Sequence, residues 1–219
     1  MVNHKNLLTA LALALYVVFL ALARVNDVFI YYAADALFSI GFILFLHVSF
    51  RFWRLNTFVY TLLILGFASH LMGVFGWYNA SPIPLQWDHV THGLPMFAFT
   101  ALFYNFARPW MTERFWSTKT WSVLLIVLLA GLGVGSLVEN LEFTGYLTLG
   151  EGEGALFFGG AGDGVPLTSS QEEVIQNLGG GYINTEMDLV WNLFGALAAV
   201  LVMSIAHYGI KTQALSRIE

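Results

Sequence analysis

Two pairs of ionisable residues in this sequence stand at helix-turn spacing. Asp88 and His92 are four positions apart in DHVTH, and Glu139 and Glu142 are three apart in VENLEF. Residues at these spacings lie on one face of a helix. Carboxylates together with an imidazole are ligands that suit Zn, Mn or Fe. The two pairs therefore indicate metal chemistry, provided that their helices pack together.

Four more polar residues belong to the same group. Asp35 lies about two turns inside an apolar run, YYAADALFSIGF, and Asp188 opens the last apolar run, with Asn192 one turn later. His70 lies in the outer third of the third run. An acid inside a membrane helix costs roughly 2.5–3.5 kcal/mol on insertion scales and usually faces a partner or a cavity.

Each acid also has a simpler explanation. Asp88 and Asp188 open their apolar runs, where an acid caps free amides or complements the helix dipole. Glu139 and Glu142 end theirs, where the dipole disfavours negative charge, so that exposure at the membrane surface is their simple explanation. For Asp35 it is a protonated or hydrogen-bonded packing role. Apart from Arg24 at the outer end of the first run, no Lys or Arg lies in the outer half of a predicted helix to balance the group. Either several of the acids are therefore protonated or a cation lies among them.

The elements that position these residues are six apolar runs. The chain has 219 residues, of which 58% are hydrophobic and 11% charged, whereas soluble domains carry about 25% charged residues. A membrane-spanning helix needs about 20 apolar residues. The runs cover residues 7–24, 28–50, 57–77, 88–107, 121–143 and 187–209. The sequence thus predicts an all-α, six-helix transmembrane bundle forming a single domain over residues 1–219.

The distribution of charge predicts the orientation. With a cytoplasmic N-terminus, eight of the nine Lys and Arg residues lie on the inner side, as the positive-inside rule requires. Both termini are then cytoplasmic, and we expect a multi-pass protein of the plasma or inner membrane. We expect residues 144–186 to form a long, Gly-rich, acidic outer loop, and loops of this length are usually either lids or flexible segments. The chain has no cysteine, which excludes disulfides and thiolate metal sites.

These features favour an intramembrane metal-dependent hydrolase. The expected cofactor is a divalent ion, Zn, Mn or Fe, which would activate water, with Glu139 or Asp188 as general base. The expected partners are membrane lipid and a lipid-like or isoprenoid substrate, and no nucleic acid. The candidate metal ligands are Asp35, Asp88, His92, Glu139, Glu142 and Asp188.

Four segments of the sequence resemble the YjdF-like family of uncharacterised bacterial and archaeal inner-membrane proteins. They are DHVTHGLPMFAFTALFYNF, GVGSLVENLEF, GDG and NTEMDLVWNLFGAL, and the resemblance covers roughly residues 57–200. The resemblance implies the same fold and site, and it adds Thr185 and Asp163 as auxiliary residues beside His70 and Asn192. Asn184 and Val138 depart from the Asp and Tyr of the family pattern. The family has no established activity to transfer.

Two alternatives use the same residues. A cation or proton transporter would move its substrate through the outer acids, although the inner halves of the helices offer few polar groups to continue the path. A b-type haem protein would use the outer His70 and His92 with the inner His47 and His207, but would leave the acids unexplained.

Overall fold

The computed structural model describes residues 4–25, 29–78, 80–149 and 171–209, and this part of the chain is helical with no strand. Short helical turns follow α3, α4 and α6. The prediction of an all-helical membrane bundle is confirmed. The six long helices are α1 (His4–Val25), α2 (Phe29–Val48), α3 (Thr57–Met72), α4 (Trp87–Ala107), α5 (Thr118–Leu149) and α6 (Gln171–Ser204).

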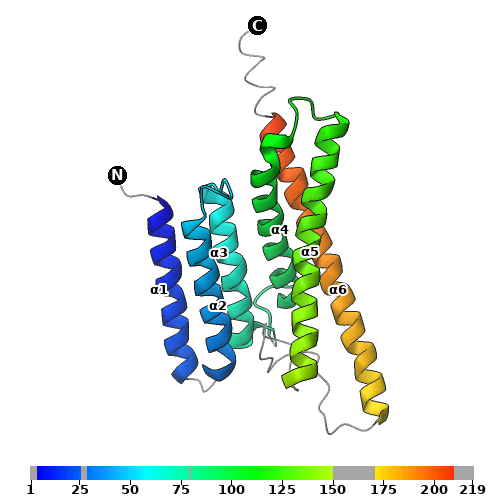
Figure 1. Ribbon diagram of the computed structural model, residues 1–219. Helices are drawn as coiled ribbons and strands as arrows, with labels where there is room; N and C mark the ends of the chain where they lie inside the picture. The colour runs from blue at the N-terminus through cyan, green and yellow to red at the C-terminus, as the bar shows by residue number, and fades with distance from the viewer. Residues whose placement is uncertain (1–3, 26–28, 79, 150–170, 210–219) are drawn as a thin grey trace.

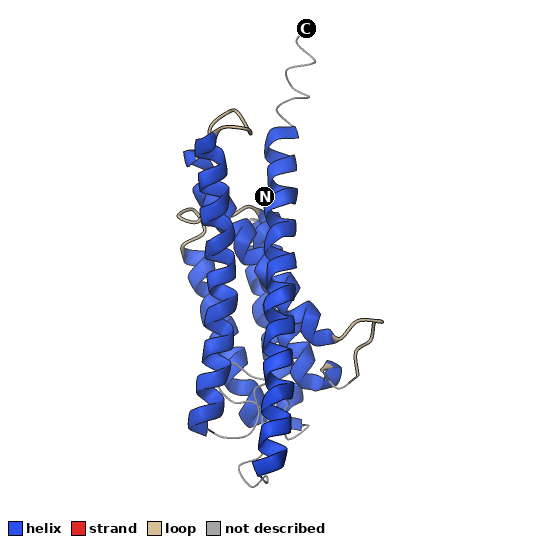
Figure 2. Cartoon of the chain, turned by 90° about the vertical axis from the view of Figure 1, so that its right-hand side faces the viewer, coloured by secondary structure: helices blue, strands red, loops and turns tan. Residues whose placement is uncertain are grey.

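Successive helices run in opposite directions, so α1 begins and α6 ends at the same end of the bundle (Figure 1). Figure 2 shows the same bundle from the side, with the helices packed along a common direction. The cytoplasmic placement of that end stays a prediction, since it depends on the charge distribution alone.

Helix α4 is the centre of the arrangement, because it packs against α3, α5 and α6. Its contact with α6 is the most extensive in the bundle. Small residues permit this approach: a Cβ atom added to Gly195 of α6 would collide with the backbone oxygen of Gly93 of α4. On the other side, Gly66 of α3 lies against Pro95, 3.2 Å from where its own Cβ would stand. Close backbone contact of this kind is typical of helix packing in membranes.

The central position of α4 also bears on the number of membrane spans. In the described part of the chain, four helical segments are long and apolar enough to cross a membrane: His4–Val25, Thr57–Trp77, Thr118–Glu142 and Thr185–Gly209. Asp35–Val48 is a shorter apolar helix. Helix α4 is not among the four, which agrees with the polar residues that it buries against its neighbours. The count of six spans therefore stays a prediction.

Two helices are longer than the sequence indicated. Helix α5 continues to Leu149 and α6 begins at Gln171, so residues 144–149 and 171–186, expected in the outer loop, belong to helices. Residues 150–170 lie outside the described part, and the role of this loop as a lid stays a prediction. As a consequence, Glu139 and Glu142 do not end their helix and Asp188 does not begin its own.

A helix break brings one further residue towards the site. Helix α3 passes into a π-helical turn, Gly73–Trp77, within which Gly76 has a φ of 113°, a conformation that favours glycine. The chain turns there, and the ring of Tyr78 folds back against Gly73. The expected helix over 57–77 is therefore present, but its last turn is π-helical and kinked at Gly76.

We predict that Gly195→Ala destabilises the bundle by about 1–3 kcal/mol, the usual cost of overpacking, since the new methyl group meets the Gly93 backbone. Thermal or denaturant unfolding in detergent measures the change. Gly133→Ala on α5 is the matched control, because Gly133 is exposed with nothing within 4 Å of the added Cβ. Equal stability of the two variants would contradict the close α4–α6 contact.

Candidate metal centre

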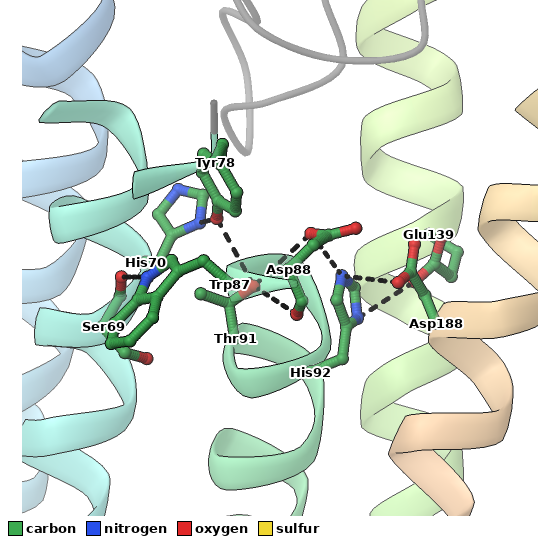
Figure 3. A network of polar contacts seen from close by, with 9 residues as sticks. All are labelled: Ser69, His70, Tyr78, Trp87, Asp88, Thr91, His92, Glu139 and Asp188. Atoms are coloured by element: carbon green, nitrogen blue, oxygen red, sulfur yellow. Dashed lines mark hydrogen bonds and ion pairs between the residues drawn. The ribbon is translucent and has the colours of Figure 1, made fainter. Parts of the chain in front are cut away.

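The imidazole of His92 lies at the meeting point of α4, α5 and α6 (Figure 3). Its Nε2 atom is 3.7 Å from Oδ1 of Asp88 and 3.7 Å from Oδ1 of Asp188. Its Nδ1 atom is 3.4 Å from Oε1 of Glu139. Three helices thus contribute a carboxylate each to the surroundings of one histidine ring.

Asp88, His92 and Asp188 form a group that could hold a metal ion. One ligand atom from each lies within 4.8 Å of the other two. Two carboxylates and an imidazole suit Zn, Mn or Fe, so the residues present fit a divalent metal of this class. The side chains of His92 and Asp188 are 10% and 3% exposed, whereas that of Asp88 is 29% exposed. The site is therefore buried on the α6 side and opens towards Asp88.

The position of Asp188 in α6 excludes the simpler explanation that it caps the start of its helix. Helix α6 begins at Gln171, so Asp188 lies well inside the helix and caps no free amides. The interaction of an acid with the helix dipole is confined to the first turn. Asp88, by contrast, does lie in the first turn of α4. A buried carboxylate inside a helix needs compensation, and the Nε2 atom of His92 lies 3.7 Å from its Oδ1 atom.

The balance of charge around His92 also favours a cation. Helices α4, α5 and α6 together contain one basic residue other than histidine, Lys119, and it belongs to the first turn of α5, at the opposite end of the bundle (Figure 1). A single imidazole can neutralise at most one of three nearby carboxylates. Because burying unpaired charge is costly, a divalent cation among Asp88, His92 and Asp188 would balance the group.

Asn192 lies beside this group. It follows Asp188 by one helical turn and is 1% exposed. Its amide lies beside His92, without reaching hydrogen-bond geometry to any described residue. A Cβ atom on Gly135 of α5 would stand 2.7 Å from the Asn192 Nδ2 atom. The expectation that Asn192 adjoins the acids therefore agrees with the structure, and its position depends on a glycine in the facing helix.

A second polar cluster extends from Asp88 towards α2. Asp35 is fully buried, and its Oδ2 atom lies 3.3 Å from Nε2 of His70. The other ring nitrogen of His70 is 2.7 Å from the Tyr78 hydroxyl. Tyr78 donates a hydrogen bond of 3.5 Å to Thr91, which itself donates one of 2.7 Å to the backbone oxygen of Asp88. A continuous chain of contacts thus links Asp35 to Asp88, and Figure 3 shows its part from His70 onward.

The contact with His70 places Asp35 apart from the other candidate metal ligands predicted from the sequence. Asp35 lies against His70, while the group of Asp88, His92 and Asp188 is assembled on α4 and α6. Tyr78 and Thr91 were missed by the sequence reasoning, because neither is charged and only the helix break after Met72 brings Tyr78 to His70. Removal of its hydroxyl from water raises the pKa of Tyr78 well above its ordinary value, so the phenol keeps its proton for hydrogen bonding.

The remaining candidates lie around the centre. Glu142 is half-buried one turn beyond Glu139 on α5, outside the group of three ligands. Thr185 is half-buried on α6, close to Asp188 in the sequence. Asp163 lies outside the described residues. The roles of these three residues stay predictions.

The histidines that a haem would need have other neighbours. Besides His70 and His92, the inner His47 lies 2.7 Å from the Thr9 hydroxyl, and His207 lies 3.3 Å from the Tyr104 hydroxyl. Because each ring nitrogen in these contacts faces a protein group, the structure adds no support to the haem alternative.

The fold and site define a class: a helical membrane protein with an Asp–His–Asp group buried between its helices. The chain belongs to the family described as predicted membrane protein (DUF2238), whose model matches residues 6–209. A multi-pass membrane location is therefore confirmed. No curated protein and no solved structure shows significant similarity to the chain.

We predict that His70→Ala destabilises the protein by about 1–3 kcal/mol, the cost of leaving a buried polar group without its partner, because Asp35 has no exposure to water. Unfolding of His70→Ala, Asp35→Asn and the double variant in detergent would form a double-mutant cycle. The effects should be non-additive. Strictly additive losses would show that Asp35 and His70 do not interact.

Proposed function

We propose that the protein binds a divalent metal ion at Asp88, His92 and Asp188 and is a metal-dependent hydrolase of the membrane. The observation that carries the proposal is the convergence of three ligand atoms within 4.8 Å, from residues up to 100 positions apart in the chain. The excess of buried carboxylates over basic residues supports it.

The proposed chemistry is hydrolysis. A bound ion of this kind lowers the pKa of a water molecule and stabilises developing negative charge. Asp88, His92 and Asp188 hold the ion, and a carboxylate of the cluster accepts the proton of the attacking water. Burial by α4, α5 and α6 limits the access of bulk water, which strengthens the electrostatic interactions inside the site. The partly exposed side of Asp88 is the side from which a substrate approaches.

The proposed substrate class is a lipid or an isoprenoid. The site lies among helices whose outer faces carry exposed apolar side chains, such as Leu125, Ile126 and Leu129 of α5. Such faces contact lipid tails, so a membrane-dissolved substrate reaches the bundle without leaving the bilayer. The resemblance to YjdF-like inner-membrane proteins supports placement in the plasma or inner membrane, with the loop after α5 as a lid.

The test of the proposal is metal content. We expect the purified protein to carry about one equivalent of Zn, Mn or Fe by elemental analysis, and Asp88→Asn and Asp188→Asn to lose most of it. Chelation should lower the unfolding temperature of the wild type, because a ligand that binds only the folded state stabilises it, and should affect the variants less.

The matched control is Glu186→Gln. Glu186 is an exposed acid two residues before Asp188, so this variant changes the charge near the site without touching the ligand group. If the wild type binds none of the three metals and chelation leaves its stability unchanged, the proposal of a metal site is wrong.

A transporter is the second candidate, and one observation favours it. Two buried polar atoms further along α4, Oγ1 of Thr100 and Nδ2 of Asn105, have no hydrogen-bond partner in the described part of the chain. They continue the polar character of α4 inward from His92. Metal uptake into proteoliposomes that Asp188→Asn abolishes would favour the transporter, whereas bound metal without flux favours the enzyme.

A further inference from the structure

The two nitrogens of the His92 ring face different surroundings. Nε2 faces Oδ1 of Asp88 and Oδ1 of Asp188, and these two acids complete the candidate ligand group with His92. Nδ1 faces Glu139, whose Oε1 is 3.4 Å away. Glu139 therefore contacts a different ring nitrogen from Asp88 and Asp188, although its carboxylate lies close to that of Asp188 (Figure 3).

This division matches the chemistry of a histidine ligand. A neutral imidazole carries its proton on one nitrogen and offers a lone pair on the other. Histidines that bind metals usually donate the remaining N–H to a carboxylate or carbonyl, which fixes the tautomer and the ring orientation. The 3.4 Å contact between Nδ1 and Oε1 of Glu139 does not itself reach hydrogen-bond geometry in the described part of the chain. With the proton on Nδ1, beside Glu139, the lone pair of Nε2 would be free for an ion held with Asp88 and Asp188.

Helix α5 is built to bring Glu139 to this position. Gly131, Gly135 and Glu139 stand at intervals of four and share one face of the helix. A Cβ on Gly131 would collide with Thr100 of α4, and one on Gly135 would stand 2.7 Å from Asn192 of α6. These contacts hold α5 against both helices over the two turns before Glu139. Its side chain is 10% exposed as a result, whereas the adjacent Asn140 is exposed and bonds to its own helix at Ser136.

We propose that Glu139 is the positioning residue of His92, and neither a metal ligand nor the general base. The inference rests on the proposed function, because it assigns a role around the same metal centre. As the acceptor for Nδ1–H, Glu139 holds the ring with Nε2 towards the ion. The general base is then a carboxylate that contacts Nε2. Of the two candidate bases predicted from the sequence, Glu139 and Asp188, this leaves Asp188.

Two substitutions separate the three roles of Glu139. Glu139→Gln keeps an oxygen that accepts the Nδ1 hydrogen bond, and Glu139→Ala removes it. We expect Glu139→Ala to weaken Zn²⁺ or Co²⁺ binding by about 10–100-fold, the usual effect of losing an outer-shell partner, and Glu139→Gln to retain most of the affinity. A ligand role requires both variants to lose the metal. A base role requires both to bind it normally.

The readouts are titration calorimetry with each metal alone and the visible absorption of the Co²⁺ form. The absorption bands report the ligand geometry, so they should change in Glu139→Ala and stay close to the wild type in Glu139→Gln. Glu186→Gln again controls for loss of an acid near this end of α6, and it should leave both readouts unchanged. If Glu139→Ala does not fold, Glu139→Met replaces it as an apolar side chain of similar length.

The measurements distinguish a wrong positioning role for Glu139 from a wrong metal site. A wild type that binds neither ion overturns both. A wild type that binds, with affinity and Co²⁺ bands unaltered in Glu139→Ala or Glu139→Met, overturns the positioning role alone. Equal losses in the Gln variant and the Ala or Met variant would make Glu139 a ligand, and would also overturn it.

Discussion

The convergence of three carboxylates on one largely buried imidazole is the constraint on which the arrangement of this protein depends. Asp88, Glu139 and Asp188 come from three helices and meet at His92, although charge removed from water must be compensated. Like-charged groups would separate if they were free to do so. The packing of α4, α5 and α6 holds them together, and this is the basis of the proposal that the cluster binds a cation.

Close contact between the helices allows the three carboxylates to meet at His92. Gly195 lets α6 meet the backbone of α4 at Gly93, and Gly131 and Gly135 let α5 approach α4 and α6. Each glycine lies within a few turns of an acid of the cluster. Larger side chains at these positions would push the helices apart and move the carboxylates away from His92. The small residues of the bundle therefore determine the geometry of the centre as much as the ligands do.

Part of the site could be predicted from local spacing. The i, i+4 relation of Asp88 and His92 holds in α4, and the selection of Asp188, Glu139 and Asn192 by depth in the membrane placed them in one layer, where the structure brings them around His92. Depth follows from counting residues along apolar helices. It does not reveal which helices are neighbours, so Asp35 was grouped with the metal ligands although it lies against His70 on the α2–α3 side.

Other features required the folded chain. Tyr78 reaches His70 because Gly76 turns the backbone after α3, and an uncharged residue after an apolar run gives no sign of this in the sequence. The arguments from helix ends were wrong for Asp188 and Glu139, because α6 starts earlier and α5 ends later than the apolar runs. The helical class and the membrane location follow from composition alone, since about 20 apolar residues in succession fit a helix across a bilayer. The partner of each acid was decided only by the tertiary structure, because helix order and rotation depend on contacts between residues distant in the chain.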